Sequence, residues 1–189
     1  MSGAEAEVTE RRPAERDELH KREYDLLDTI LQDMADAVVA EECYVHVQPR
    51  RVFVRVHPDR LREFIRYMQR EHDMWQVSTL SGRDLGDDLQ ANYHFFLNDK
   101  KIAITIKVNV PRDKPEYPSI TDLIPGVDFV ENEIREMFGI VPVGHPNPRR
   151  CELPENWPGE EYPLRKDWAD PRGLMKRSKT TGPKPKEEL

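Results

Sequence analysis

The sequence predicts an α+β fold, with a single mixed or antiparallel sheet, helices packed mainly on one face of it, and a long irregular C-terminal extension. Three observations support this prediction. Segments with apolar residues at helical spacing recur along the chain, and shorter segments of alternating apolar and polar residues lie between them. Residues 102–110 place Ile or Val at every second position, so one face of this strand can carry helices. Prolines recur after residue 140, where they prevent regular structure.

The composition predicts one compact domain flanked by polar segments. With 189 residues, of which 37% are hydrophobic, the chain can bury the core of one ordinary domain. Its mean hydropathy of -0.80 indicates surplus polar length, which we assign to the two ends. We expect a polar N-terminal arm at residues 1–15, a compact α/β domain at 16–139, a proline-rich docking extension at 140–168 and a basic tail at 169–189.

The N-terminal half of the domain is expected to begin with a long amphipathic helix over residues 16–42. Apolar residues recur there every three or four positions, and we expect this stripe to pack in the core of the same domain. Residues 43–48 and 51–56 then have the character of two paired strands. Helical spacing resumes over residues 59–72.

The next segments predict the rest of the sheet. Residues 75–80 are predicted to form a strand, and the hydrophilic residues 81–88 are expected to form a polar turn. This turn holds two glycines but neither the lysine of a P-loop nor the dinucleotide-binding fingerprint, so no phosphate site is predicted. Residues 93–97 and 102–110 make the clearest hairpin, and His94 is expected to lie on its outward face.

A second helix signal follows the sheet. Ser119 can cap a short helical turn over residues 119–124, and a longer helix is expected from Asp128 to the residue before Gly139. Asp128 suits the positive end of the helix dipole, and glycine suits a left-handed closing position. The apolar stripe of this helix consists of Val127, Val130, Ile134, Met137 and Phe138.

The acids on this helix allow two interpretations. Glu131 and Arg135 stand one turn apart in the favourable order, which predicts an exposed ion pair worth about half a kcal/mol. We therefore prefer a structural role for the acids. The alternative from another class of function is an independent acid/base or metal-dependent enzyme that uses Glu133, Glu136 and His145.

Other classes of function find little support. A net charge of -7 argues against general nucleic-acid binding, although the tail after residue 169 is locally basic. Only two cysteines are present, Cys43 and Cys151, and no clustered ligand spacing predicts a metal centre. No apolar run approaches the roughly twenty residues that cross a bilayer, and residues 1–18 lack the apolar centre of a secretory signal, so we expect a cytoplasmic protein.

The extension at residues 140–168 is expected to bind another protein. A segment of this length without regular structure is uncommon in a compact domain unless it binds something or is disordered. Trp157, Tyr162 and Trp168 alternate with basic residues, and tryptophan and arginine are the side chains that anchor interfaces. We therefore expect contact with a partner to order it.

The helix and the extension together resemble a known family. The residues that carry the resemblance are Glu131, Glu133, Glu136, Met137, Phe138, Gly139, His145, Pro146, Arg149 and Arg150, followed by Tyr162, Pro163, Leu164, Arg165, Lys166, Asp167 and Trp168. They are similar to the signature of the thirty-kilodalton subunit family of respiratory complex I. That family also occurs in membrane-bound NiFe hydrogenases and related complexes, and residues 153–158 (LPENWP) look more like the hydrogenase branch. Asn132 and the pair Cys151-Glu152 depart from the usual pattern.

The resemblance implies a function as part of a larger assembly. It implies a non-catalytic structural subunit of a membrane-bound, complex-I-like redox complex, in which electron transfer is coupled to ion translocation. A hydrogenase-type complex is the first interpretation, and an NADH/quinone-type complex I is the alternative. The implied partners are a large hydrogenase-like or quinone-reductase-like subunit and an iron-sulfur subunit, with membrane subunits reached indirectly.

The resemblance also implies where the cofactors and the contacts lie. No cofactor is implied in this chain, because the iron-sulfur clusters and, in the hydrogenase branch, the NiFe centre belong to partner subunits. The implied location is the inner face of the cell membrane, peripherally, through those partners. The side chains expected to dock on them are Glu133, Glu136, His145, Arg149, Arg150, Trp157, Tyr162, Arg165, Lys166, Asp167 and Trp168.

Overall fold

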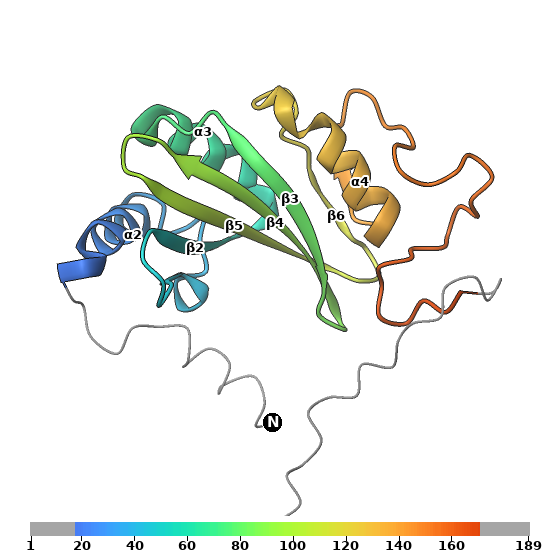
Figure 1. Cartoon of the computed structure of the whole chain (residues 1–189), viewed down its shortest axis with the longest axis horizontal. Helices are drawn as coiled ribbons and strands as arrows, with labels where there is room; N and C mark the ends of the chain where they lie inside the picture. The colour runs from blue at the N-terminus through green and yellow to red at the C-terminus, as the bar shows by residue number, and fades with distance from the viewer. Residues whose placement is uncertain (1–17, 171–189) are drawn as a thin grey trace, which may run out of the picture.

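The computed structural model describes residues 18–170, and its centre is a five-stranded mixed sheet (Figure 1). The strand order is β1-β2-β5-β4-β3. Strands β2 and β5 run parallel, whereas the other neighbours are antiparallel. The strands are β1 (Tyr44–Val45), β2 (Arg51–Val56), β3 (Val77–Asp84), β4 (Asp88–Leu97) and β5 (Ile102–Pro111).

The register of the strands separates an apolar face from a polar one. Val54 pairs with Ile106, which pairs with Tyr93 on the next strand, and all three side chains are fully buried. One residue along, Thr105 pairs with His94 on the opposite face, where the His94 ring shares hydrogen bonds with the hydroxyls of Thr105 and Ser81. The predicted hairpin, its alternation and the outward position of His94 are confirmed.

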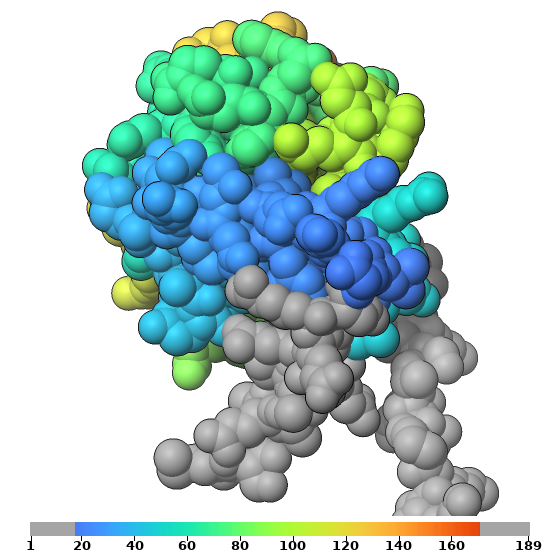
Figure 2. Space-filling model, turned by 90° about the vertical axis from the view of Figure 1, so that its left-hand side faces the viewer, coloured from blue at the N-terminus to red at the C-terminus, as the bar shows by residue number. Residues whose placement is uncertain are grey.

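Three helices complete the domain: α2 (Lys21–Asp33), α3 (Leu61–His72) and α4 (Asp128–Phe138). Side chains from all three and from the apolar sheet face form one buried core. In Figure 1, α2 lies near β2 and α4 lies beside β3, toward the other edge of the sheet. Figure 2 shows α2 and α3 next to each other, where they meet the turn between β4 and β5. The predicted fold class is confirmed.

The first helix is shorter than predicted. It ends at Asp33, although helical spacing continues to residue 42. Val38 instead forms an antiparallel bridge with Val56, and the backbone N–H of Val39 donates to the carbonyl of Arg55. Both Val38 and Val39 are β-branched, which favours this extended pairing over helix. Residues 16 and 17 lie outside the described residues.

The predicted polar turn at residues 81–88 is mostly strand. Strand β3 continues to Asp84 and β4 begins at Asp88, so only three residues turn the chain. Gly82 faces α4, and a Cβ at this position would collide with the Phe138 ring. The glycine therefore lets α4 approach the sheet closely, which is a recognised use of glycine in strands.

A second, two-stranded sheet joins the start of the predicted extension to the domain. Strands β6 (Glu116–Pro118) and β7 (Val141–Val143) pair in parallel, and Ile140 beside them is fully buried. The folded unit thus continues past Gly139, where the compact domain was expected to end. Gly139 itself closes α4 in the left-handed conformation, as predicted.

The N-terminal arm predicted at residues 1–15 and residues 171–189 of the predicted basic tail lie outside the described residues. Within residues 18–170, no helix combines the length and the apolar character needed to cross a bilayer.

Candidate functional site

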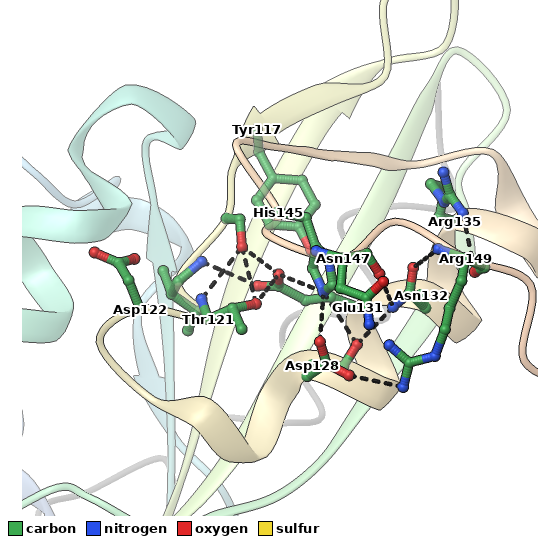
Figure 3. A network of polar contacts seen from close by, with 12 residues as sticks. Tyr117, Thr121, Asp122, Asp128, Glu131, Asn132, Arg135, His145, Asn147 and Arg149 are labelled. Carbon is green, nitrogen blue, oxygen red and sulfur yellow. Dashed lines mark hydrogen bonds and ion pairs between the residues drawn. The ribbon is translucent and has the colours of Figure 1, made fainter.

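The polar residues of α4 are the centre of the candidate site, and Glu131 is the most deeply buried of them (Figure 3). Its side chain is fully buried and accepts four hydrogen bonds. The donors are the Tyr93 hydroxyl at 2.6 Å, the Ser119 hydroxyl at 2.5 Å, the Thr121 hydroxyl at 2.9 Å and the Ile120 backbone N–H at 3.1 Å. A buried carboxylate with all its partners in place is a rigid structural element.

The tyrosines of this network act as fixed donors. Burial raises the pKa of Tyr93 and of Tyr117 well above the usual value, and the nearby charge of Glu131 acts in the same direction. The Tyr93 hydroxyl lies within hydrogen-bond distance of both Glu131 and Tyr117. These phenols therefore stay protonated, and the network ties β4 and residues 117–121 to α4.

The predicted surface ion pair between Glu131 and Arg135 is wrong. Glu131 turns into the core, and Arg135 donates to the backbone carbonyl of Arg149 at 2.9 Å. Sequence reasoning missed this burial, although a signal existed: Glu131 lies at helical spacing between Val127 and Ile134, which are both buried. An acid in the middle of an apolar stripe was the available sign of a buried acceptor.

The start of the extension is anchored on the same helix. His145 is buried, and its Nε2 lies 3.1 Å from the carbonyl oxygen of Asp128, while its Nδ1 accepts from the backbone N–H of Asn147. Asn132 donates to the carbonyl of Asn147 at 3.1 Å and accepts from the N–H of Arg149 at 3.0 Å. The asparagine that departs from the family pattern therefore serves as a backbone clamp.

Glu136 forms the next anchor. Its carboxylate accepts from the backbone N–H groups of Cys151 at 2.9 Å, Glu152 at 2.8 Å and Leu153 at 3.4 Å. Arg149 adds an ion pair with Asp128 at 3.0 Å. Three successive amides are thus held by one side chain, and the irregular backbone keeps a defined path without regular secondary structure.

The far end of the extension returns to the C-terminus of α4. Arg165 donates through Nε to the carbonyl of Phe138 at 2.7 Å, and its guanidinium lies 4.2 Å from the centre of the Tyr162 ring. These two residues pack directly over Gly139. A Cβ at that glycine would lie 2.5 Å from Tyr162 Cζ and 2.6 Å from an Arg165 nitrogen, so only glycine fits.

A charge cluster holds the last described turn. Asp84 accepts from the Lys166 backbone N–H at 2.8 Å and from Arg112, which also binds Asp167 at 2.7 Å. Burial alone would raise the pKa of Asp84, but the hydrogen bonds from Arg112 and from the N–H groups of Lys166 and Gly86 lower it from 3.8 to about 2. Asp84 therefore carries a negative charge in the folded protein at neutral pH.

Between its two ends, the extension arches away from α4 (Figure 1). The rings of Trp157 and Trp168 lie with their centres 6.0 Å apart, and the Trp157 indole donates to the carbonyl of Glu161. Beneath the arch lies a hollow of about 310 Å³. Its lining residues are Arg135, Glu136, Val141, Arg150, Leu153, Trp157, Pro158, Gly159, Glu161 and Tyr162.

The predicted docking residues thus fall into two groups. The side chains of Glu136, His145, Arg165 and Asp167, together with that of Arg149, bind other parts of the same chain. Internal contacts therefore hold the described extension, which was expected to be ordered by a partner. Arg149, Arg150 and Lys166 keep exposed side chains, while Glu133, Trp157, Tyr162 and Trp168 are half-buried. We retain this second group as the predicted contact surface.

The geometry does not assemble the alternative enzyme site. Glu136 lines the hollow under the arch, Glu133 lines a separate groove beside Phe138 and Leu164, and His145 lines neither. Both oxygens of Glu136 and both ring nitrogens of His145 are engaged with the backbone. Within residues 18–170, no cluster of three or more His, Cys, Asp or Glu side chains could hold a metal ion.

Comparison with known proteins links this architecture to redox complexes. Residues 54–172 match the model of a family described as respiratory-chain NADH dehydrogenase, 30 Kd subunit. Formate hydrogenlyase subunit 5 of Escherichia coli is 38% identical, in an alignment that covers 63% of this chain and 21% of that protein. Hydrogenase-4 component G of the same organism is 33% identical, in an alignment that covers 78% of this chain and 26% of that protein. The chain therefore spans about a fifth to a quarter of these two relatives.

Other relatives are closer to it in length. A subunit of the NADH-quinone oxidoreductase of Roseiflexus castenholzii is 36% identical, with 60% of this chain covering 67% of that protein. Among solved structures, a chain of the membrane-bound sulfane sulfur reductase, an archaeal respiratory membrane complex, superposes with a TM-score of 0.64 at 22% identity, covering 79% of this chain and 86% of that one. A trypsin-resistant fragment of Nqo5 superposes with a TM-score of 0.55 at 20% sequence identity, and the superposition covers 67% of this chain and 98% of that fragment. These two structures support the fold.

Proposed function

Because the chain belongs to the family of the 30 kDa subunit of respiratory-chain NADH dehydrogenase, we propose that it is a non-catalytic structural subunit of a membrane-bound, complex-I-like redox complex. The family match over residues 54–172 is the observation that carries this proposal. We prefer a hydrogenase-type complex, since formate hydrogenlyase subunit 5 and hydrogenase-4 component G are both relatives at 33% identity or more. The run at residues 153–158, which resembles the hydrogenase branch, supports the same choice.

A quinone-reducing complex is the second candidate. The NADH-quinone oxidoreductase relative is 36% identical and is matched over 67% of its length. Both candidates place the chain in the same structural role. They differ in the large subunit on which it docks.

In this proposal, the partners carry the cofactors. The large subunit would hold the NiFe or quinone site, an iron-sulfur subunit would hold the neighbouring cluster, and this chain would hold none. Membrane subunits would be reached only through those partners, at the inner face of the membrane. The described cysteines, Cys43 and Cys151, form no disulfide and belong to no metal-ligand cluster of the described residues.

The physical basis of the role is a docking extension that is already ordered. Glu136 and Asn132 fix its start on α4, and Arg165 fixes its end on Phe138. A segment held in its binding conformation loses little conformational entropy when a partner binds, so more of the contact energy is available for affinity. The exposed arginines and half-buried tryptophans are the side-chain types that anchor such interfaces.

Affinity purification of a tagged chain from solubilised membranes tests the proposal. We expect a hydrogenase-like large subunit and an iron-sulfur subunit to be recovered with it, and the chain purified alone to be colourless and free of metal. Recovery of a metal-loaded, active monomer without other subunits would contradict the proposal. Neighbouring genes for large, ferredoxin-like and antiporter-like subunits would separate hydrogenase from quinone reductase.

A double variant in the extension tests whether the extension itself binds the partner subunits. Substituting both Arg149 and Arg165 with alanine is expected to reduce recovery of the partner subunits, because one exposed cation and the anchor on Phe138 are lost together. Arg70→Ala, at the exposed end of α3, serves as the control and should leave recovery unchanged. Equal recovery with both variants would show that these two arginines contribute nothing to docking.

A further inference from the structure

The hollow beneath the arch of the extension is lined by two arginines that pair with no carboxylate of the described residues. Arg135 and Arg150 both line it, and neither forms an ion pair with any carboxylate of residues 18–170. Arg135 donates once, to the carbonyl of Arg149, and its Nε is buried with no hydrogen-bond partner among the described residues. Arg150 makes a single 3.3 Å contact with the carbonyl of Pro154. A buried guanidinium donor without an acceptor is unfavourable, so the site is incomplete by itself.

The acids of the hollow are already occupied. Glu136 uses both oxygens on three backbone N–H groups, and Glu161 receives the Trp168 indole at 3.4 Å. Neither pairs with Arg135 or Arg150. The neighbouring Arg149, by contrast, forms an ion pair with Asp128. The net charge of the chain is -7, yet Arg135 and Arg150 pair with no carboxylate among the described residues.

We propose that this hollow receives the carboxylate of an acidic side chain from the subunit on which the chain docks. Guanidinium groups bind carboxylates in a planar, two-pronged geometry, and Arg135 and Arg150 approach the hollow from α4 and from the extension. Trp157 and Tyr162 provide aromatic walls of the kind that surround interface anchors. A volume of about 310 Å³ admits one side chain and lies at the small end of ligand pockets, about 300–1,000 Å³. This inference rests on the proposed function and specifies the chemistry of its partner.

A protein carboxylate fits better than a free phosphate. Sites for small oxyanions generally use successive backbone N–H groups as donors. Here the successive N–H groups of residues 151–153 all point to Glu136 and are already used. What remains is one half-buried guanidinium, that of Arg135, and one exposed guanidinium, that of Arg150, and this pair matches a carboxylate from another chain.

Zero-length crosslinking in the assembled complex tests the proposal. In Arg150→Lys, a carbodiimide can couple the introduced amine to a carboxylate in direct contact, whereas the wild-type guanidinium does not react. We expect mass spectrometry to find an amide link to an Asp or Glu of another subunit. The control Arg70→Lys places an amine beside Glu71 at the end of α3, and it should link only within the chain. A link from position 150 only to Glu136 or Glu161, or no link at all, would overturn the proposal.

Affinity measurements provide the second readout. Arg150→Met keeps most of the side-chain length and removes the charge, and we expect the large subunit to bind it about tenfold or more weakly than the wild type. The isolated variant should melt at the wild-type temperature, because Arg150 makes only one weak internal contact. Unchanged affinity would reject the pocket while leaving the proposed function in place. Failure of the wild-type chain to bind any other subunit would reject both.

The isolated chain separates a partner carboxylate from a small anion. Thermal melting is measured with and without inorganic phosphate, in the wild type and in Arg150→Met. We expect no difference between the two proteins. If phosphate stabilises the wild type alone and no crosslink to another subunit forms, the hollow is a site for small anions and the proposal fails.

Discussion

At the scale of single residues, two acids on α4, Glu131 and Glu136, connect the helix to other segments through hydrogen bonds instead of hydrophobic contacts. Glu131 joins the helix to β4 and to residues 119–121, and Glu136 joins it to residues 151–153. Both bind donors from the chain and neither faces a cation at ion-pair distance within residues 18–170, apart from the ring of His145 at 4.0 Å from Glu131. Their role is to accept hydrogen bonds, and this predicts a strong sensitivity to isosteric change.

Replacing Glu131 with glutamine tests that sensitivity. The amide of Glu131→Gln would place N–H groups against the donors that now point at an oxygen, inside a fully buried site. We expect the free energy of unfolding to fall by about 2–4 kcal/mol, as measured by urea denaturation. Glu133→Gln is the matched control on the same helix, because Glu133 is half-buried and makes no described hydrogen bond, and it should change stability by less than about 0.5 kcal/mol. Equal stabilities of the two variants would contradict a four-donor site.

Asp84 predicts how stability depends on pH. Its pKa in the folded protein is lowered to about 2, so its contribution is complete above the ordinary value of 3.8 and is lost as the pH falls through about 2. We expect Asp84→Asn to be less stable than the wild type by about 2 kcal/mol at neutral pH, with the difference shrinking between about pH 4 and 2. Urea denaturation across this range measures it.

The control for Asp84 lies in the same turn. Asp87 is exposed, and its side chain makes no described hydrogen bond, so Asp87→Asn should show a nearly constant difference from the wild type over the same pH range. A constant difference for Asp84→Asn as well would mean that the cluster with Arg112 and Asp167 does not hold the end of the extension.

At the scale of elements, the junction between α4 and the extension depends on one glycine. Gly139 has φ of +69°, and the Tyr162 ring and the Arg165 guanidinium occupy the space where a side chain would be. We expect Gly139→Ala to displace residues 162–166 from the end of α4, which limited trypsin digestion would detect as faster cleavage at Arg165 and Lys166. Gly144→Ala controls for backbone strain, since Gly144 has φ of +83° and open space around it, and it should leave this cleavage rate near that of the wild type.

The elements that the sequence predicted well are those whose burial follows simple periods. Ile104 and Ile106 alternate with polar residues in β5, and Ile134 and Phe138 recur at helical spacing in α4, so local pattern and tertiary packing agree. Gly139 as the end of α4 belongs to the same class, because its position directly follows the last apolar pair.

The elements that the sequence did not reveal depend on distant partners. Val38 is extended rather than helical because it forms an antiparallel bridge with Val56, which is distant in the sequence. Gly82 lies in β3 rather than in a turn, and its lack of a side chain leaves room for the distant Phe138 ring. In the site, the aromatic and basic character of residues 157–168 was visible, but the use of Glu136 and Arg165 as internal anchors was not, since neither backbone acceptors nor donors have a sequence signature.

At the scale of the whole molecule, the described residues form a buried core and an outer layer that the core positions. The buried cluster draws on the sheet and the three helices, and no described residue of the extension beyond Ile140 belongs to it. Residues 146–168 contact the domain through hydrogen bonds to α4 and to Asp84, and through the packing of Tyr162 and Arg165 over Gly139. The domain should therefore fold without the extension, whereas assembly should require it.

A chain that ends after residue 147 tests this division of roles. It keeps β7, the buried His145 and the carbonyl of Asn147 that binds Asn132, and it loses the arch, its arginines and its tryptophans. We expect wild-type far-ultraviolet circular dichroism and a single cooperative urea transition, because the hydrophobic core is unchanged. We also expect recovery of partner subunits from membranes to fall at least tenfold. A truncated chain that assembles normally would assign docking to another surface, such as the polar face of the sheet. If the truncated chain fails to fold, the extension is an integral part of the domain. Its contacts with α4 would then be needed first for the stability of the fold, and only secondarily for assembly.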